Sequence, residues 1–356
     1  MNTRTRISTC LTAALTCAGL AAAATGCGSS GSAQHAVPGL APTYLRPDGQ
    51  VVRTDQGGDT VSEGQAYGML LAEAAGNHAA FGHIWTWTRD HLQQGDGLFS
   101  WHASPSGHVI SQQAASDADL LIAWALLRYR GPGAAAWHNA GRRVARAILA
   151  REVTTGPGGV PVLAAGPWAT GRPASLNPSY WSLGAFQGLA RLTGNQEWRR
   201  LAAGAVTLTG QLTRGGQQLP PDWAELTAAG ALQPEPAPGG AQPVTQYGPD
   251  AQRTVVWFAA SCNPQAKALA ARWWPLLRPS GRDQALVLNP TGSVLNADPA
   301  VLPLVASASA ARAAGDSAAT RTLLHRAAAE QHSHPTYYGA AWDALGKNLL
   351  STSNGC

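Results

Sequence analysis

The sequence lacks the motifs by which nucleotide-dependent enzymes and serine hydrolases are usually recognised. It has no phosphate-binding glycine loop, no strand–loop–helix dinucleotide fingerprint and no Gly-x-Ser-x-Gly nucleophile elbow. Basic residues are scattered, and without Arg4 and Arg6 the formal net charge falls from +5 to +3, so nucleic-acid binding is not indicated. These absences leave nucleotide-dependent chemistry and serine-based hydrolysis without support.

Cysteine is scarce, with five residues in the chain. Cys10 and Cys17 lie in the N-terminal segment, and no Cys or His spacing is typical of a structural zinc site, so we expect no metal and no cofactor. Cys262 and Cys356 form an even pair in an exported chain and predict a disulfide, with two buried free thiols as the alternative.

Long apolar runs are also absent, apart from Leu11–Ala24. Arg4 and Arg6 precede this run, and it is too short to span a bilayer comfortably as a helix. A basic start, an apolar middle and small residues at the end are typical of a secretory signal, which we place at residues 1–26. The mature protein is therefore expected outside the cell membrane, either anchored to it or secreted.

Cys27 directly follows the small residues of this segment and resembles the cysteine of a bacterial lipobox, although Ala24 stands where leucine is usual. We expect lipidation of Cys27, with an ordinary secretory signal as the alternative. Residues 27–40 are rich in glycine and serine at their start and predict a flexible tether. Residues 41–356 then form one large domain, expected to be monomeric.

Tryptophan is abundant where phenylalanine is not, with thirteen residues against four. The flat indole face suits the C–H faces of sugars, and core packing explains many tryptophans equally well. This bias favours a carbohydrate substrate without establishing it.

Helical spacing of apolar residues dominates the rest of the chain and predicts an all-α fold of about eleven helices in antiparallel hairpins. Short extended pieces are expected near residues 51–53, 107–110 and 159–163. The hairpins fit either an irregular bundle or a closed ring. The expected helices are Glu63–Ala75, Phe81–Leu92, Asp117–Tyr129, Ala134–Arg151, Pro178–Leu192, Gln196–Leu212, Gln252–Ser261, Pro264–Leu277, Pro299–Ala314, Ser317–Gln331 and Thr336–Leu350.

Two of these helices open with acids. Ser62 and Gln65 read as a capping box around Glu63, and the neighbouring Gly64 and Gly68 are poor helix formers unless another group approaches the backbone closely. Ser116 could cap the helix that carries Asp117 and Asp119. Acids in a first helical turn complement the helix dipole, so a purely structural role is the alternative for each.

Three further segments place polar or aromatic groups beside rigid backbone. Asp250 reads as an N-cap with Arg253 three residues later, either a surface ion pair or a carboxylate at the edge of a cleft. The pairs Asp222–Trp223 and Tyr180–Trp181 follow prolines closely and are either stacking platforms or turns packed on the core.

Taken in order, these segments resemble glycoside hydrolase family 8. The resemblance runs from residues 48–52 to residues 337–338 and includes the acid motif at residues 60–70, the signature at residues 115–123, and residues 177–180, 221–223 and 250–253. It implies an (α/α)6 barrel of six inner and six outer helices, and an inverting mechanism with two carboxyl groups roughly 6.5–9.5 Å apart. The chain departs from the family at Pro249, Trp124 and Arg128-Tyr129-Arg130.

The resemblance also implies roles for individual residues. Glu63 falls on the general acid, Asp250 on the general base, and Asp117 on the signature aspartate expected to hold the distorted sugar. The expected sugar-binding residues are Tyr67, Trp101, Asp119, Tyr180, Trp181, Asp222, Trp223 and Arg253.

The function implied is endo-acting cleavage of a β-1,4-linked polysaccharide, with a cellulose-like β-1,4-glucan as the leading substrate. A chitosanase or another exopolysaccharide hydrolase of the same family is the close alternative. An alternative of a different class is a non-catalytic glycan-binding lipoprotein on the same scaffold.

Overall fold

The structure, a computed structural model, describes residues 37, 39–40, 42–238 and 244–351. Within them it contains eleven α-helices, the number that the sequence predicts. The helices are α1 (Ser62–Ala74), α2 (His78–Leu92), α3 (Ser116–Arg128), α4 (Ala134–Arg151), α5 (Leu183–Thr193), α6 (Glu197–Leu212), α7 (Pro249–Ala260), α8 (Pro264–Leu277), α9 (Val301–Ala313), α10 (Ser317–Ser333) and α11 (Tyr337–Ser351).

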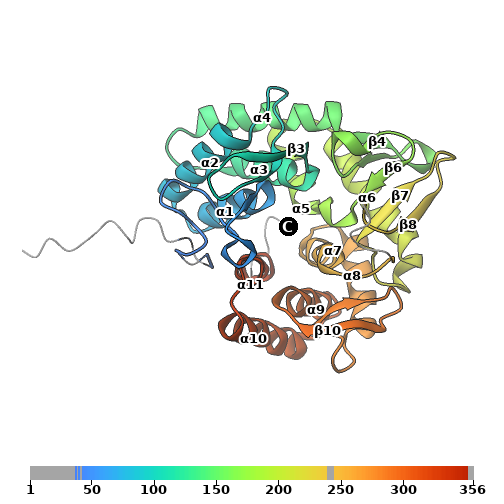
Figure 1. The fold of residues 1–356 in the computed structure, drawn as a ribbon. Coiled ribbons are helices and arrows are strands. Elements are labelled where there is room, and N and C mark those ends of the chain that lie inside the picture. The colour runs from blue at the N-terminus through green and yellow to red at the C-terminus, as the bar shows by residue number, and fades with distance from the viewer. Residues whose placement is uncertain (1–36, 38, 41, 239–243, 352–356) are drawn as a thin grey trace, which may run out of the picture.

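The odd-numbered helices form a closed inner ring, in which each packs against the next and α11 returns to α1. The even-numbered helices pack around the outside of this ring (Figure 1). Hairpins with short links produce this alternation because each connection takes the chain from the inner to the outer layer. The predicted (α/α)6 barrel is confirmed, and the irregular bundle is excluded; five outer helices lie within the described residues.

Burial distinguishes the two layers. Helices α3 and α9 are buried almost all round, whereas α4 buries only a stripe that includes Val144 and Ile148. An all-round apolar helix requires cover on every side, which an inner position provides. Four tryptophans are also fully buried in this core, so packing accounts for part of the tryptophan bias: they are Trp181, Trp198, Trp273 and Trp342.

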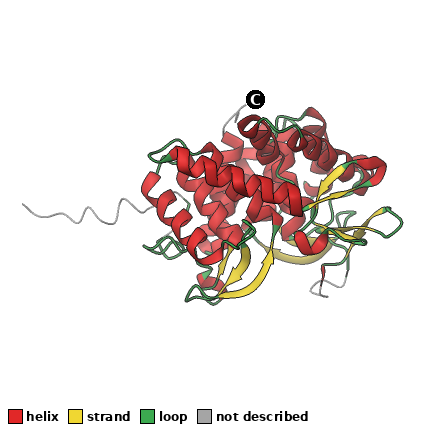
Figure 2. Ribbon diagram, turned by 90° about the horizontal axis from the view of Figure 1, so that it is seen from above, coloured by secondary structure: helices red, strands yellow, loops and turns green. Residues whose placement is uncertain are grey.

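Ten short antiparallel strands accompany the helices. Most lie in the loops before inner helices, and Figure 2 shows them gathered along one side of the helical ring. Strands this short carry no alternating pattern, so the sequence predicted only three extended pieces. The sheets are β1 (Thr60–Val61), β2 (Ser100–Ala103) and β3 (Val109–Ala114); β4 (Val153–Thr155) and β5 (Pro161–Leu163); β6 (Ala174–Leu176), β7 (Trp223–Leu226) and β8 (Leu232–Glu235); β9 (Ala285–Leu288) and β10 (Val294–Pro299).

The predicted helix caps are wrong at three inner helices. Ser62 is the first residue of α1, directly after strand backbone at Val61, and its side chain caps nothing. Ser116 instead donates to the carbonyl of Ala164 at 2.6 Å. Asp250 lies in the first turn of α7, whose N-cap is Gly248. Ser116 and Asp250 therefore bind other parts of the chain instead of capping their own helices.

The helix predicted from Pro178 is two elements. Residues 178–180 form a 3-10 turn that Asn177 caps, and α5 begins only at Leu183, where Ser182 caps it. Tyr180 ends the 3-10 turn and is partly exposed, whereas Trp181 lies on the connection to α5 and is buried.

Both ends of the chain carry predictions that the structure leaves open. The predicted signal and Cys27 lie outside the described residues, as does Cys356. Cys262 is disulfide-bonded. No helix in the described part of the chain is long and apolar enough to cross a bilayer.

Candidate active site

Three inner helices bring three carboxyl groups to one guanidinium. Glu63, Asp117 and Asp250 lie in the first turns of α1, α3 and α7. Nη1 of Arg253 donates to Glu63 and, over 3.0 Å, to Asp117, while Nη2 donates to Asp250 over 2.5 Å. Residues from three distant segments therefore meet at the end of the barrel where the inner helices begin.

Solvent reaches these groups unequally. The side chains of Arg253 and Asp117 are 4% and 7% exposed, whereas those of Glu63 and Asp250 are 23% and 28% exposed. A buried cation is tolerated where several anions and hydrogen bonds compensate its desolvation. The arrangement leaves Glu63 and Asp250 accessible to a substrate. The buried Arg253 binds each of them through a different nitrogen.

Asp117 titrates unusually. Burial and the nearby charge of Glu63 raise its pKa to about 7, against the opposing effects of Arg253 and the backbone N–H of Ala118. The Asp117 carboxyl therefore changes charge near neutral pH. In its protonated form it can donate a hydrogen bond to a sugar oxygen, and in its ionised form it can accept one.

Tyr67 lies one turn after Glu63 on α1 and donates its hydroxyl hydrogen to that carboxyl. Burial, followed by the charge of Glu63, raises the pKa of Tyr67 well above its usual range, so the phenol remains a neutral donor. The side chain is buried. The structure gives Tyr67 a contact with Glu63, and the sugar contact predicted for it stays a prediction.

Asp250 is held by two donors, one on each oxygen. Arg253 binds Oδ1, and the side-chain amide of Asn177 donates to Oδ2 over 3.0 Å. Asn177 also accepts the backbone N–H of Ser179, which fixes its orientation. Asn177 lies in one of the segments that resemble the family, but the sequence indicates no role for it. Its position before Pro178 was the available signal.

Asp222 binds the backbone on both sides of Asp250. It is buried and accepts the backbone N–H groups of Gly248 and Ala251 at 2.9 and 2.7 Å, and the amide of Gln246 at 3.0 Å. Burial and the charge of Asp250 raise its pKa to about 7. The side chain therefore anchors the start of α7 and so positions Asp250, and the sugar contact predicted for Asp222 stays a prediction.

Asp119 and Trp181 also bind neighbouring parts of the chain. Asp119 is fully buried, accepts the backbone N–H of Phe99 at 2.9 Å and pairs with the equally buried Glu152. Burial raises the pKa of both carboxyls well above the usual range. Trp181 is buried and donates to the carbonyl of Leu163 at 2.9 Å. Both side chains are buried, and the sugar contacts predicted for them stay predictions.

Partly exposed aromatic rings remain as stacking surfaces. Tyr180 lies 5.5 Å from the guanidinium carbon of Arg253 and meets Trp223 edge to face, with 6.1 Å between ring centroids. Trp101 on β2 stacks on His102 at 4.6 Å. Tyr338 on α11 is a further partly exposed ring near the carboxyls, and the sequence gave no signal for it beyond the end of the resemblance.

The site contains the carboxyl groups that acid–base catalysis at an oxygen atom requires. Two accessible carboxyls flank a fixed guanidinium, and a third carboxyl titrates near neutrality. Within the described residues, no group of three or more histidine, cysteine, aspartate or glutamate side chains is arranged to hold a metal ion.

A carboxyl cluster at the helix-start end of an (α/α)6 barrel, bordered by aromatic rings, defines a glycoside hydrolase. The sequence model of the family described as "Glycosyl hydrolases family 8" matches residues 17–345, and the chain belongs to this family.

Relatives and solved structures agree with this assignment. The chain is 35% identical over 251 residues to a probable endoglucanase of Novacetimonas hansenii, covering 65% of this chain and 68% of that protein. It is 32% identical over 196 residues to an endoglucanase of Cellulomonas uda, covering 54% and 55% of the two chains. A family 8 endo-β-1,4-glucanase from an Achatina fulica gut metagenomic library superposes with a TM-score of 0.72 at 28% identity, covering 87% and 95%.

Proposed function

We propose that this protein cleaves β-1,4-glucan chains internally, with inversion at the anomeric carbon. The observation that carries the proposal is the convergence of Glu63, Asp117 and Asp250 on Arg253. The relatives described as endoglucanases support the substrate class. Export to the outer face of the membrane through lipidated Cys27, and a monomeric state, belong to the proposal as well.

The reaction divides between the two accessible carboxyls. Glu63 gives its proton to the glycosidic oxygen as the bond from that oxygen to the anomeric carbon breaks. Asp250 takes a proton from a water molecule, whose oxygen forms the new bond on the opposite face of the sugar. Each turnover consumes one water, and the two carboxyls end with their protonation states exchanged, so solvent must restore them.

Asp117 and Arg253 support this exchange. Arg253 contacts both carboxyls through different nitrogens, which keeps them from sharing a proton directly. Asp117 lies on the same guanidinium and is largely buried, a position suited to binding a hydroxyl of the sugar at the cleavage point. Tyr180, Trp223 and Trp101 supply faces on which neighbouring sugar rings stack.

The decisive experiment compares wild type with Glu63→Gln on carboxymethyl-cellulose, barley β-glucan, chitosan and xylan, following new reducing ends. Loss of a general acid lowers the rate roughly 10²–10⁴-fold. Glu197→Gln on α6 is the matched control, because Glu197 is an exposed acid paired with the exposed Arg200. Activity of Glu63→Gln equal to wild type would overturn the assignment of the acid.

Leaving-group chemistry separates the two carboxyls. A dinitrophenyl cellobioside needs no proton on departure, so Glu63→Gln should cleave it at close to the wild-type rate, whereas Asp250→Asn should fail on both substrates. NMR of the first-formed anomer tests inversion. Preference for chitosan would indicate the chitosanase alternative, and a folded wild type that binds glycans without cleaving them would indicate a binding protein.

A further inference from the structure

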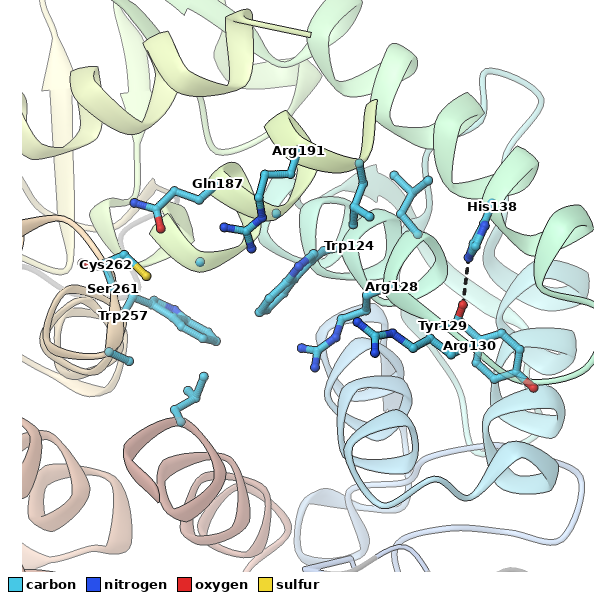
Figure 3. A pocket seen from close by; sticks show the side chains of 16 residues that line it. Trp124, Arg128, Tyr129, Arg130, His138, Gln187, Arg191, Trp257, Ser261 and Cys262 are labelled. Carbon is cyan, nitrogen blue, oxygen red and sulfur yellow. Dashed lines mark hydrogen bonds between the residues drawn. The ribbon is translucent and has the colours of Figure 1, made fainter. Parts of the chain in front are cut away.

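A cavity lies at the opposite end of the barrel from the carboxyls. It has a volume of about 430 Å³ and is lined by residues near the ends of α3, α5 and α7, together with residues of α4 and α11. Because Glu63, Asp117 and Asp250 lie at the beginnings of the inner helices, this cavity is a separate site. Its size falls within the range of small-molecule sites. Figure 3 shows side chains from several helices converging on it.

The cavity is cationic. Among the described residues, Arg128, Arg130 and Arg191 line it, and no aspartate or glutamate does. Arg128 pairs with Glu73 at 2.9 Å, outside the lining. The guanidinium group of Arg191 forms no hydrogen bond or ion pair with any described residue, whereas the charge of Arg130, with that of Arg128, acts to lower the pKa of the buried Glu73 carboxyl. Arginines in the last turn of a helix complement its dipole, which accounts for the presence of Arg128 at the end of α3 and of Arg191 at the end of α5. Arg130 lies beyond the end of α3, so the dipole does not explain why the three converge.

An indole face borders the same space. Trp124 is partly exposed, with the guanidinium carbon of Arg128 4.9 Å from its ring centroid. Two glycines of α5 make room for it: a Cβ on Gly188 would lie 2.3 Å from Nε1 of Trp124, and one on Gly184 would lie 3.6 Å from the ring. The indole N–H donates to no described residue. Trp257 adds a second, mostly buried ring to the wall.

We propose that this cavity binds an acidic saccharide, a sugar ring that carries a carboxylate. The indole of Trp124 supplies a flat face for the ring, and the planar guanidinium groups of Arg130 and Arg191 match a carboxylate in charge and geometry. Gln187 and Ser261, which also line the cavity, provide hydrogen bonds for hydroxyl groups. The residues involved include Trp124 and Arg130, where the chain departs from the family pattern.

The site is independent of catalysis, so the full chain is titrated by calorimetry with D-glucuronate, cellobiose and inorganic phosphate, each to millimolar concentration. The proposal is supported if the heat of glucuronate binding saturates and if cellobiose and phosphate each bind at least tenfold more weakly. Equal binding of cellobiose overturns the role of charge. Equal binding of phosphate shows a simple anion site and overturns the saccharide. Absence of glucuronate binding overturns the proposal outright.

Variants locate the binding. Arg191→Gln should weaken glucuronate binding about tenfold, since a charge-assisted contact is lost, and Trp124→Phe should weaken it by a smaller factor. Arg199→Gln on α6, also an exposed arginine, is the matched control and should bind as wild type does. Hydrolysis of carboxymethyl-cellulose should be unchanged in Arg191→Gln. Wild-type affinity in both cavity variants would place the saccharide elsewhere and overturn the assignment.

Discussion

Asn177 donates its side-chain amide to Oδ2 of Asp250 over 3.0 Å, although 73 positions separate the two residues. Because Arg253 occupies the other oxygen, the carboxylate cannot rotate without losing one donor. A general base works only when its free lone pair points at the water that it activates. Asn177 therefore fixes the direction of Asp250 from a segment that precedes α5.

The variant Asn177→Asp tests this relationship. Its Oδ1 can still accept the N–H of Ser179, but its second oxygen replaces a donor with a negative acceptor facing Asp250. We expect kcat on β-glucan to fall about 100-fold, with a much smaller change in KM, because the loss is in orientation and charge at the base. Steady-state kinetics on the soluble polymer measures both.

Asn195→Asp is the control for this substitution. Asn195 accepts the backbone N–H of Glu197, two residues later, as Asn177 accepts that of Ser179, but it lies at the exposed start of α6. Its kinetics should equal those of wild type. An Asn177→Asp protein with undiminished kcat would show that the amide of Asn177 does not orient the base.

Arg253→Lys should destabilise the protein as well as inactivate it. A lysine retains the charge but cannot place two nitrogens on Asp117 and Asp250 at once. Breaking a buried ion pair costs about 3–5 kcal/mol, and we expect a loss near the lower end in the free energy of unfolding by urea. Arg200→Lys alters an exposed pair with the same three-residue spacing and should cost less than about 1 kcal/mol. Equal losses would contradict the structural role of Arg253.

The prediction for Asp222 concerns pH. Its pKa is about 7 in the folded protein against a usual value of 3.8, so the folded state retains a proton that the unfolded chain releases. The contribution of Asp222 to the free energy of unfolding therefore falls as pH rises from about 4 to about 7, and the penalty is complete above that range.

Asp222→Asn removes this titration while retaining an oxygen for Gly248 and Ala251. In urea denaturation from pH 4 to 8, stability should fall less steeply for Asp222→Asn than for wild type, because one carboxyl with a raised pKa is gone. A fall should remain, because Asp117, Asp119 and Glu152 titrate in both proteins. Parallel curves would contradict the raised pKa. Asp222→Ala should in addition lower kcat, since the start of α7 loses its anchor.

The sequence predicted the helix number, the barrel and the carboxyls, because helical periodicity and family motifs are local in the chain. It gave no indication of which polar and aromatic side chains are buried by distant segments. Asp119 and Asp117 lie two positions apart in the same motif and look alike in the sequence. Asp119, however, has its partner Glu152 at the end of another helix. Trp181 reads like Tyr180, but the turn between two helical elements directs its indole into the core. Such differences arise only when the hairpins close into a ring.

Glycines at the start of α1 illustrate what the sequence could indicate. Gly64 and Gly68 predicted a close approach to the helix, and the structure confirms it. A Cβ on Gly64 would lie 2.6 Å from the hydroxyl of Tyr337, and one on Gly68 would lie 3.0 Å from Val51 and 3.2 Å from Ile84. Gly64→Ala must therefore displace Tyr337 from α1, next to Glu63. We expect loss of stability and a lower kcat despite the better helix propensity of alanine.

Gly210→Ala on α6 separates helix propensity from contact. A Cβ there meets only Leu269, at 4.0 Å, so the substitution should stabilise the protein by up to about 1 kcal/mol in urea denaturation. If Gly64→Ala also gained stability and retained wild-type kcat, the contact with Tyr337 would not constrain α1. If Gly64→Ala lowers the free energy of unfolding and Gly210→Ala raises it, then close packing against α11, and not helix propensity, requires glycine beside Glu63.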